Sequence, residues 1–125
     1  MNMKVMERRI KLPSITIDAS PKKIIDVANQ VPTDWGQGIK YLEEIYKLKI
    51  IRLNIYNPNS SNAKVEIYDG NPDEGGIKVS TVVAYANQNT IVDESYIQYI
   101  FRTAIYIKTD VTPLEINGEL EAILV

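Results

Sequence analysis

The sequence has 125 residues, of which 45% are hydrophobic and 24% charged, with a formal net charge of −2. This length fits one domain, the composition is that of a globular protein, and the small negative charge gives no reason to expect nucleic-acid binding. Cysteine and histidine are both absent, which excludes disulfides, thiolate metal sites, and the commonest general base and metal ligand.

Residues 1–12 predict a basic arm, and residues 13–125 predict the domain. Lys4, Arg8 and Arg9 lie in the arm, and no hydrophobic segment follows them as a secretory signal requires. No apolar run of the sequence approaches the ~20 residues of a membrane-spanning helix. We therefore expect neither a signal peptide nor contact with a membrane.

The region from the arm to residue 48 gives mixed signals. Pro13 interrupts strand pairing because it lacks an N–H donor, and residues 14–18 alternate as a short strand. Ser20-Pro21 combines a hydroxyl N-cap with a proline, which favours a helix over residues 21–29, although a strand over residues 23–27 fits nearly as well. Residues 39–47 are also open between helix and strand, and we favour one short helix there.

The rest of the chain reads as alternating strands separated by polar turns. Residues 49–56 and 63–68 alternate with period two, residues 77–86 predict a longer strand rich in Val and Thr, and clusters of Asn, Pro and Gly separate these segments. The longest alternation covers residues 97–125 and predicts two long strands joined as a hairpin by a polar turn. We therefore predict a mainly β protein, an antiparallel β-sandwich of the jelly-roll kind with about eight strands, and one or two short helices in the first 48 residues.

Charge is distributed unevenly along the chain. Most basic residues fall in the first half of the sequence, and most acidic residues fall in the second. Such a split can steer subunits head to tail. We favour the alternative, in which strands of both halves interleave in the sandwich and balance the field.

One polar loop resembles a calcium-binding loop in part. Side-chain oxygens of Asp69, Asn71 and Asp73 have the spacing of the first three ligands. The match then fails, because Glu74 stands where the loop requires glycine and Ser80 stands where it requires a bidentate glutamate. Turn chemistry explains the same residues, so we expect no metal and no cofactor.

Candidate catalytic groups are few. The only paired carboxylates are Glu43-Glu44, Asp73-Glu74 and Asp93-Glu94. Neighbours in a strand point to opposite faces, so adjacency does not provide the two converging carboxyl groups of glycoside hydrolysis. The sequence contains neither a serine-nucleophile elbow nor a phosphate-binding glycine loop. We predict a protein that is not an enzyme.

The strands carry more apolar residues than one buried face requires. A lone sandwich needs one buried face per sheet, and extra apolar residues on the other face indicate a partner surface, commonly a symmetric one. The residues predicted to form this interface are Ile50, Tyr56, Ile100, Ala104, Tyr106 and Ile123.

Eight tyrosines and one tryptophan raise an alternative, a carbohydrate-binding face on which sugars stack against exposed rings. The candidate ligand platform comprises Trp35, Tyr41, Tyr68 and Tyr85. Tyrosine is also a normal strand residue and a favoured interface residue, so sheet packing and subunit contact explain the same residues.

Four stretches together resemble small β-sandwich structural proteins of phages and other viruses. Residues 53–58 (LNIYNP) and 63–70 (AKVEIYDG) are similar to a strand, an Asn-Pro-rich turn and a strand that ends in Tyr-Asp-Gly; residues 105–109 (IYIKT) and 116–120 (INGEL) are similar to the closing hairpin of such proteins. The resemblance covers about residues 50–125. It implies a virion component, such as a capsid accessory, decoration, tail or fibre-associated subunit, and it assigns no functional residue.

These observations predict a non-enzymatic structural protein that associates with itself and with other virion proteins. The alternative is a carbohydrate-binding module for attachment, with a glycan as its ligand. The expected location is the virion, or otherwise the cytoplasm. High isoleucine and lysine content without cysteine or histidine favours a heat-adapted source, although an AT-rich genome produces the same composition.

Overall fold

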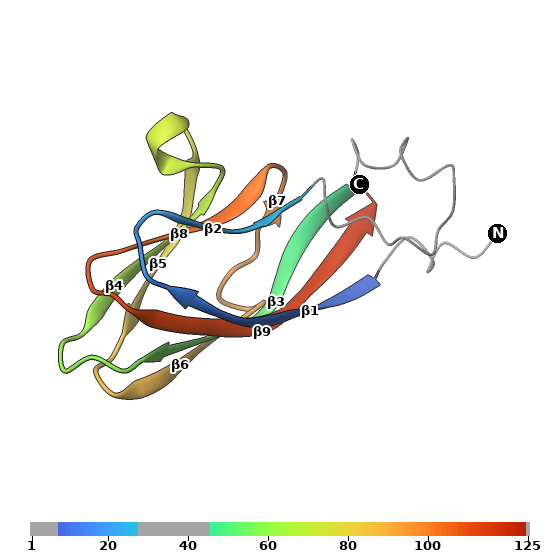
Figure 1. The fold of residues 1–125 in the computed structure, drawn as a ribbon. Coiled ribbons are helices and arrows are strands. Elements are labelled where there is room, and N and C mark those ends of the chain that lie inside the picture. The colour runs from blue at the N-terminus through green and yellow to red at the C-terminus, as the bar shows by residue number, and fades with distance from the viewer. Residues whose placement is uncertain (1–7, 28–45, 125) are drawn as a thin grey trace.

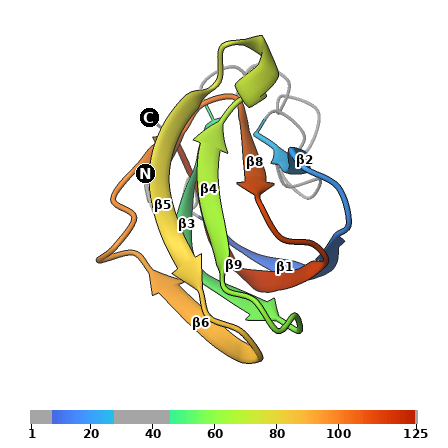
Figure 2. The ribbon, with the colours of Figure 1, turned by 90° about the vertical axis from the view of Figure 1, so that its left-hand side faces the viewer.

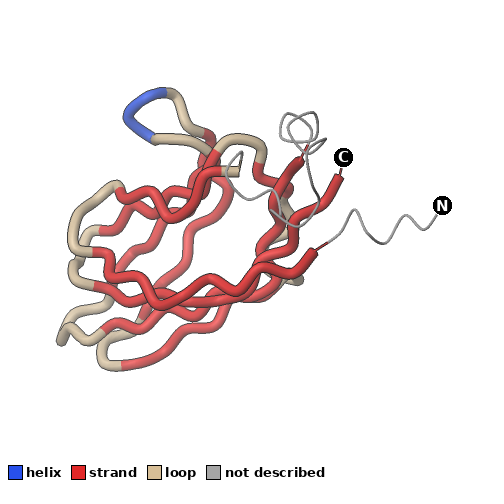
Figure 3. The backbone as a smooth tube through the Cα atoms, turned by 45° about the vertical axis from the view of Figure 1, so that its right-hand side comes forward, coloured by secondary structure: helices blue, strands red, loops and turns tan. Residues whose placement is uncertain are grey.

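The computed structural model describes residues 8–27 and 46–124 of the chain, apart from the side chains of Arg8, Tyr46 and Leu124. Its strands are β1 (Arg8–Ile17), β2 (Lys22–Asp26), β3 (Tyr46–Asn57), β4 (Ala63–Asp69), β5 (Ile77–Ala84), β6 (Gln88–Asp93), β7 (Ile100–Phe101), β8 (Ala104–Thr109) and β9 (Leu114–Leu124) (Figure 1). A single 3-10 turn, η5 (Pro72–Glu74), is the helical segment within the described ranges (Figure 3).

The strands form two antiparallel sheets with apolar side chains between them. The first sheet has the order β1-β9-β3-β6, with β7 also paired to β3, and the second has the order β2-β8-β4-β5 (Figure 2). Side chains from both sheets form one buried apolar cluster. The predicted mainly β, sandwich-like fold is therefore confirmed.

A bulge in β3 decides which of its residues are buried. Leu48 and Ile50 face the core before the bulge, whereas Leu53 and Ile55 face it afterwards. The register with β9 shifts between Ile50 and Arg52, and one extra residue reverses the alternation of a strand. Ile50 is therefore 0% exposed, and its prediction as an interface residue, which assumed an unbroken alternation, is wrong.

The alternation predicted for β9 is confirmed. Its buried residues Leu114, Ile116, Leu120 and Ala122 form one row against the core. Gly118 continues this row beside β3, and a Cβ atom there would lie only 2.2 Å from the carbonyl oxygen of Arg52. The close approach of the two central strands therefore requires glycine.

The hairpin predicted within residues 97–125 is wrong. β8 pairs with β2 and β4, whereas β9 pairs with β1 and β3. Residues 110–113 therefore carry the chain from one sheet to the other. Alternation reports which side of a strand is buried, but it does not report which strand lies beside it.

The choice between helix and strand that the sequence left open for residues 21–29 is decided for the strand over the described residues 22–26. Residues 22–26 form β2 and pair with β8. The hydroxyl oxygen of Ser20 accepts a hydrogen bond from the Thr109 N–H (2.9 Å), so this capping residue binds a sheet strand instead of a helix. Residues 39–45 of the other predicted helix lie outside the described residues, and Tyr46 and Lys47 begin β3.

The last part of the predicted arm, residues 8–12, pairs with β9 as the first half of β1. The register shifts between Leu12 and Ile15, around Pro13, as the missing N–H donor predicts. Residues 1–7 lie outside the described residues.

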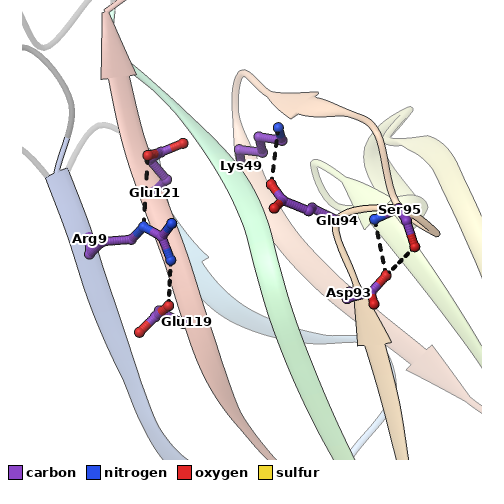
Figure 4. Close-up of polar contacts among 7 residues, drawn as sticks. All are labelled: Arg9, Lys49, Asp93, Glu94, Ser95, Glu119 and Glu121. Carbon is purple, nitrogen blue, oxygen red and sulfur yellow. Dashed lines mark hydrogen bonds and ion pairs between the residues drawn. The ribbon is translucent and has the colours of Figure 1, made fainter.

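At β1 and β9, basic and acidic segments of the chain lie side by side. Arg9 Nη1 lies 2.6 Å from Glu119 Oε1, and Arg9 Nε lies 3.8 Å from Glu121 Oε2 (Figure 4). Because β1 comes from the basic half of the chain and β9 from the acidic half, part of the uneven charge is balanced within one molecule.

Candidate interaction site

The connection from β6 to β8, residues 94–103, lies along one side of the sandwich beside β5 (Figure 2). The Tyr96 hydroxyl donates a hydrogen bond to the Thr81 carbonyl oxygen of β5 (3.0 Å). Ile97 is buried, whereas Gln98 and Ile100 are exposed. This exposure agrees with the predicted alternation, which places Gln98 and Ile100 on the opposite side of the segment from Ile97. We call residues 98–100 the ridge.

A buried carboxylate holds the ridge in place. Asp69, at the end of β4, is 5% exposed. Its Oδ2 accepts hydrogen bonds from the Tyr99 hydroxyl (2.9 Å) and the Arg102 N–H (3.0 Å), and its Oδ1 accepts from the N–H groups of Thr103 (2.9 Å) and Ala104 (3.3 Å). Burial, and then the hydrogen bond to Asp69, raises the pKa of Tyr99, so the hydroxyl remains a donor at neutral pH.

These contacts explain the calcium-like residues as structural ones. The Asp69 oxygens are occupied by hydrogen bonds, and the Asn71 side chain accepts a hydrogen bond from the Asp73 N–H (2.9 Å) as the cap of η5. Across the described part of the chain, no group of three or more acidic side chains is arranged to hold a metal ion.

One flank of the ridge borders an open hollow of about 660 Å³, which we call the acidic hollow. The Lys49 ammonium lies 3.3 Å from Glu94 Oε2 (Figure 4). Among the described lining residues, the two glutamates Glu94 and Glu121 outnumber the one lysine, and Glu121 also lies 3.8 Å from Arg9 Nε, which is not part of the lining. The residues that line it include Lys49, Glu94, Gln98, Ile100, Glu121 and Ile123.

The other flank borders an open hollow of about 620 Å³, which we call the basic hollow. Lys78 donates a hydrogen bond to Glu66 (3.0 Å), and this bond holds the pKa of Glu66 below its usual value. The Arg102 side chain is exposed, and the described residues offer its guanidinium no ion-pair partner. The lining includes Lys78, Val79, Tyr96, Gln98, Ile100 and Arg102, and none of its described lining residues is acidic.

Exposed hydrophobic side chains adjoin the ridge. Tyr96 and Ile100 line its hollows, and Ile77 lines a neighbouring hollow together with Tyr99 and Arg102. Adjacent exposed apolar side chains are typical of an interaction surface. The other large exposed hydrophobic residues among those described are Tyr56, Val83, Tyr85 and Ile91, and the register places Ile91 on the outer face of the first sheet, as it does Tyr56.

The predicted interface residues lie on several surfaces. Ile100 and Ile123 come together as lining residues of the acidic hollow. Tyr56 is exposed on the outer face of the first sheet, and Tyr106 is half-buried on the outer face of the second. Ala104 is 2% exposed, so its prediction as an interface residue is wrong.

The burial of Ala104 has a local cause. Its carbonyl oxygen accepts a hydrogen bond from the Gly70 N–H (2.8 Å), and its own N–H donates to Asp69 (3.3 Å). These two hydrogen bonds hold the connection that follows β4 against the start of β8. Alternation within β8 could not predict this contact with a distant loop.

The proposed ligand platform is only partly described. Trp35 and Tyr41 lie outside the described residues, and Tyr85 is exposed just beyond β5. Tyr68 lies directly opposite Tyr106 in the register of β4 and β8. From the sequence, Tyr68 belongs to the predicted ligand platform and Tyr106 to the predicted interface, because strand pairing is not visible in the alternation of a single strand.

Lys78 and Arg102 were not singled out from the sequence, and Glu94 was named only as a member of an adjacent carboxylate pair. Lys78, Glu94 and Arg102 come from different segments, and only the fold brings them around the ridge. The sequence feature that indicates this site is the alternation of residues 97–102, which places the side chains of Gln98 and Ile100 on the exposed side of the ridge.

Comparisons with protein-family models, with curated proteins and with solved structures found no match. Within the described ranges, no helix has the length and apolar character needed to span a membrane. Function must therefore be inferred from the chain's own fold and surfaces.

Proposed function

We propose that the protein is a non-enzymatic structural subunit with jelly-roll topology, which acts by self-association as a component of a virus particle. The strand order supports this topology. Apart from the short β7, eight strands form two four-stranded sheets, β1-β9-β3-β6 and β2-β8-β4-β5, as expected for two Greek keys wound into a jelly roll. Viral capsid domains use this architecture, in agreement with the resemblance over residues 50–125.

A fold alone does not determine function, so the support for self-association comes from the surface of the molecule. The supporting observation is the group of exposed hydrophobic residues at the ridge, namely Ile77 at 61% exposure, Tyr96 at 59% and Ile100 at 36%. Apolar side chains that are clustered and surrounded by charged residues are typical of a protein–protein contact. Association of identical chains is the commonest use of such a surface in soluble oligomers.

Sedimentation equilibrium tests the proposed self-association. We expect a mass above the 14.2 kDa of one chain, and we expect the Ile100→Asp variant to sediment as a monomer, because the contact would then bury a carboxylate without a partner. Tyr56→Asp is the matched control, since Tyr56 is 38% exposed and Ile100 is 36% exposed, and it should leave the mass unchanged. A wild-type mass of 14.2 kDa at every concentration would exclude self-association.

A carbohydrate-binding module is the second candidate, and one arrangement favours it. Tyr68 and Tyr106 lie opposite each other on the second sheet, and in the strand register Lys23 is opposite Tyr106 and Lys78 is opposite Tyr68. A row of two aromatic rings between two donors can hold a sugar, and lectins also use the jelly roll. This candidate predicts a monomer, so the same mass measurement separates the two functions.

A further inference from the structure

We infer that the protein forms a two-fold dimer whose axis runs along the ridge, with the acidic hollow of each copy facing the basic hollow of the other. This inference rests on the proposed self-association and identifies its surface and its partner, a second copy of the chain.

The geometry of the two hollows is the first support. Gln98, Tyr99 and Ile100 line both of them. The other lining residues of the acidic hollow include Lys49 and Glu121 of the first sheet, whereas those of the basic hollow include Lys78 of the second sheet, so the hollows lie on the two flanks of the ridge. A two-fold rotation about an axis along the ridge, in the plane of the contact, exchanges the two flanks. Two copies placed face to face in this way bring an acidic hollow against a basic hollow twice, and the same patch serves both copies.

Charge complementarity is the second support. Glu94 is 51% exposed in its side chain and has one described ion pair, to Lys49. Arg102 is exposed and lacks an ion-pair partner among the described residues. In the two-fold arrangement, the basic hollow that contains Arg102 in each copy lies opposite the acidic hollow that contains Glu94 in the other. Such pairs at the edge of a contact fix its orientation more than its strength.

The apolar residues supply the remaining contact. Ile100 lies on the ridge and meets its own counterpart near the axis, and Tyr96 lines the basic hollow beside it. Buried aromatic and aliphatic side chains near the centre of a contact carry most of the binding energy. Charged residues on both flanks then surround an apolar centre, which is the usual anatomy of a protein–protein interface.

Other ways of joining two copies fit less well. A contact that places basic hollow against basic hollow brings Lys78 and Arg102 of the two copies together, and like charges disfavour it. An open head-to-tail chain requires each copy to bind two neighbours, one at each hollow. Because the hollows share the ridge as a wall, a neighbour that covers one hollow also covers the ridge, and this leaves no room for a second neighbour.

Charge reversal tests the arrangement. We expect Arg102→Glu and Glu94→Arg, each alone, to raise the dissociation constant of the dimer at least about tenfold, because each homodimer would place like charges opposite each other twice. An equimolar mixture of the two variants should form a heterodimer of near wild-type affinity. The double variant, in which both charges are reversed, should also recover the homodimer. Arg52→Glu, on the outer face of the first sheet, is the matched control and should have no effect.

Sedimentation equilibrium of each sample, with circular dichroism to verify folding, distinguishes the outcomes. Recovery in both the mixture and the double variant supports the two-fold pairing. Single variants that associate like the wild type, or a mixture and a double variant that stay monomeric, overturn the pairing but leave self-association intact. A wild-type dimer that grows into longer chains also overturns it. A monomeric wild type contradicts both this inference and the proposed function.

Discussion

Replacement of Asp69 by asparagine is expected to lower the free energy of unfolding by about 3 kcal/mol. The carboxylate accepts four hydrogen bonds, two on each oxygen. Asparagine has a similar shape but offers one oxygen, and its amide group would face two of the donors. Because the site is buried, those donors would lose their partner without gaining water. Urea unfolding followed by circular dichroism measures the change.

Asp110→Asn is the control for this prediction. Asp110 is exposed, and its Oδ1 accepts one hydrogen bond, from the Lys64 N–H (2.8 Å). Loss of this bond should cost less than about 1 kcal/mol, since water can replace it. Equal effects of the two substitutions would contradict the role of Asp69 as the buried anchor of the ridge.

Gly118→Ala should destabilise the sandwich by about 3 kcal/mol or more. Its Cβ would lie 2.2 Å from the Arg52 carbonyl oxygen and 3.1 Å from the Leu53 Cα. Both are backbone atoms that no rotamer change can move, so β3 and β9 would have to separate at the centre of the first sheet. Thermal or denaturant unfolding measures the loss.

The same substitution at Gly75 is the comparison. A Cβ at Gly75 meets nothing within 4 Å, but the residue has a φ of +86°. Gly75→Ala should therefore cost only about 1–2 kcal/mol, through backbone strain. A Gly118→Ala variant as stable as Gly75→Ala would show that the two central strands can separate freely at this position.

Period-two alternation predicted the buried rows of this fold well. It predicted that one face of a strand contains the buried residues Leu114, Ile116, Leu120 and Ala122, and that the side chains of Gln98 and Ile100 are exposed. These properties depend on a single strand and its pleat, so they are visible in the sequence.

Strand partners and local irregularities were not predictable in the same way. The bulge between Ile50 and Arg52 reverses the face of β3, and an extra residue leaves no clear mark on an apolar stretch. Ser20-Pro21 fits a helix start nearly as well as a strand, and pairing of β2 with β8 decides for the strand, because tertiary contacts override local propensity. The two hollows combine residues from distant segments, so only the topology could reveal them.

Cross-linking at the ridge tests the central claim most directly, because the chain contains no cysteine. Residues near a two-fold axis lie close to their own counterparts. A single Gln98→Cys substitution, treated with an oxidant or a short bismaleimide, is therefore predicted to give a covalent dimer in high yield on a denaturing gel. Asn117→Cys, exposed on the outer face of the first sheet, should remain a single chain. Equal cross-linking of the two variants, or none at Gln98→Cys at concentrations where the wild type is a dimer, would contradict association through the ridge.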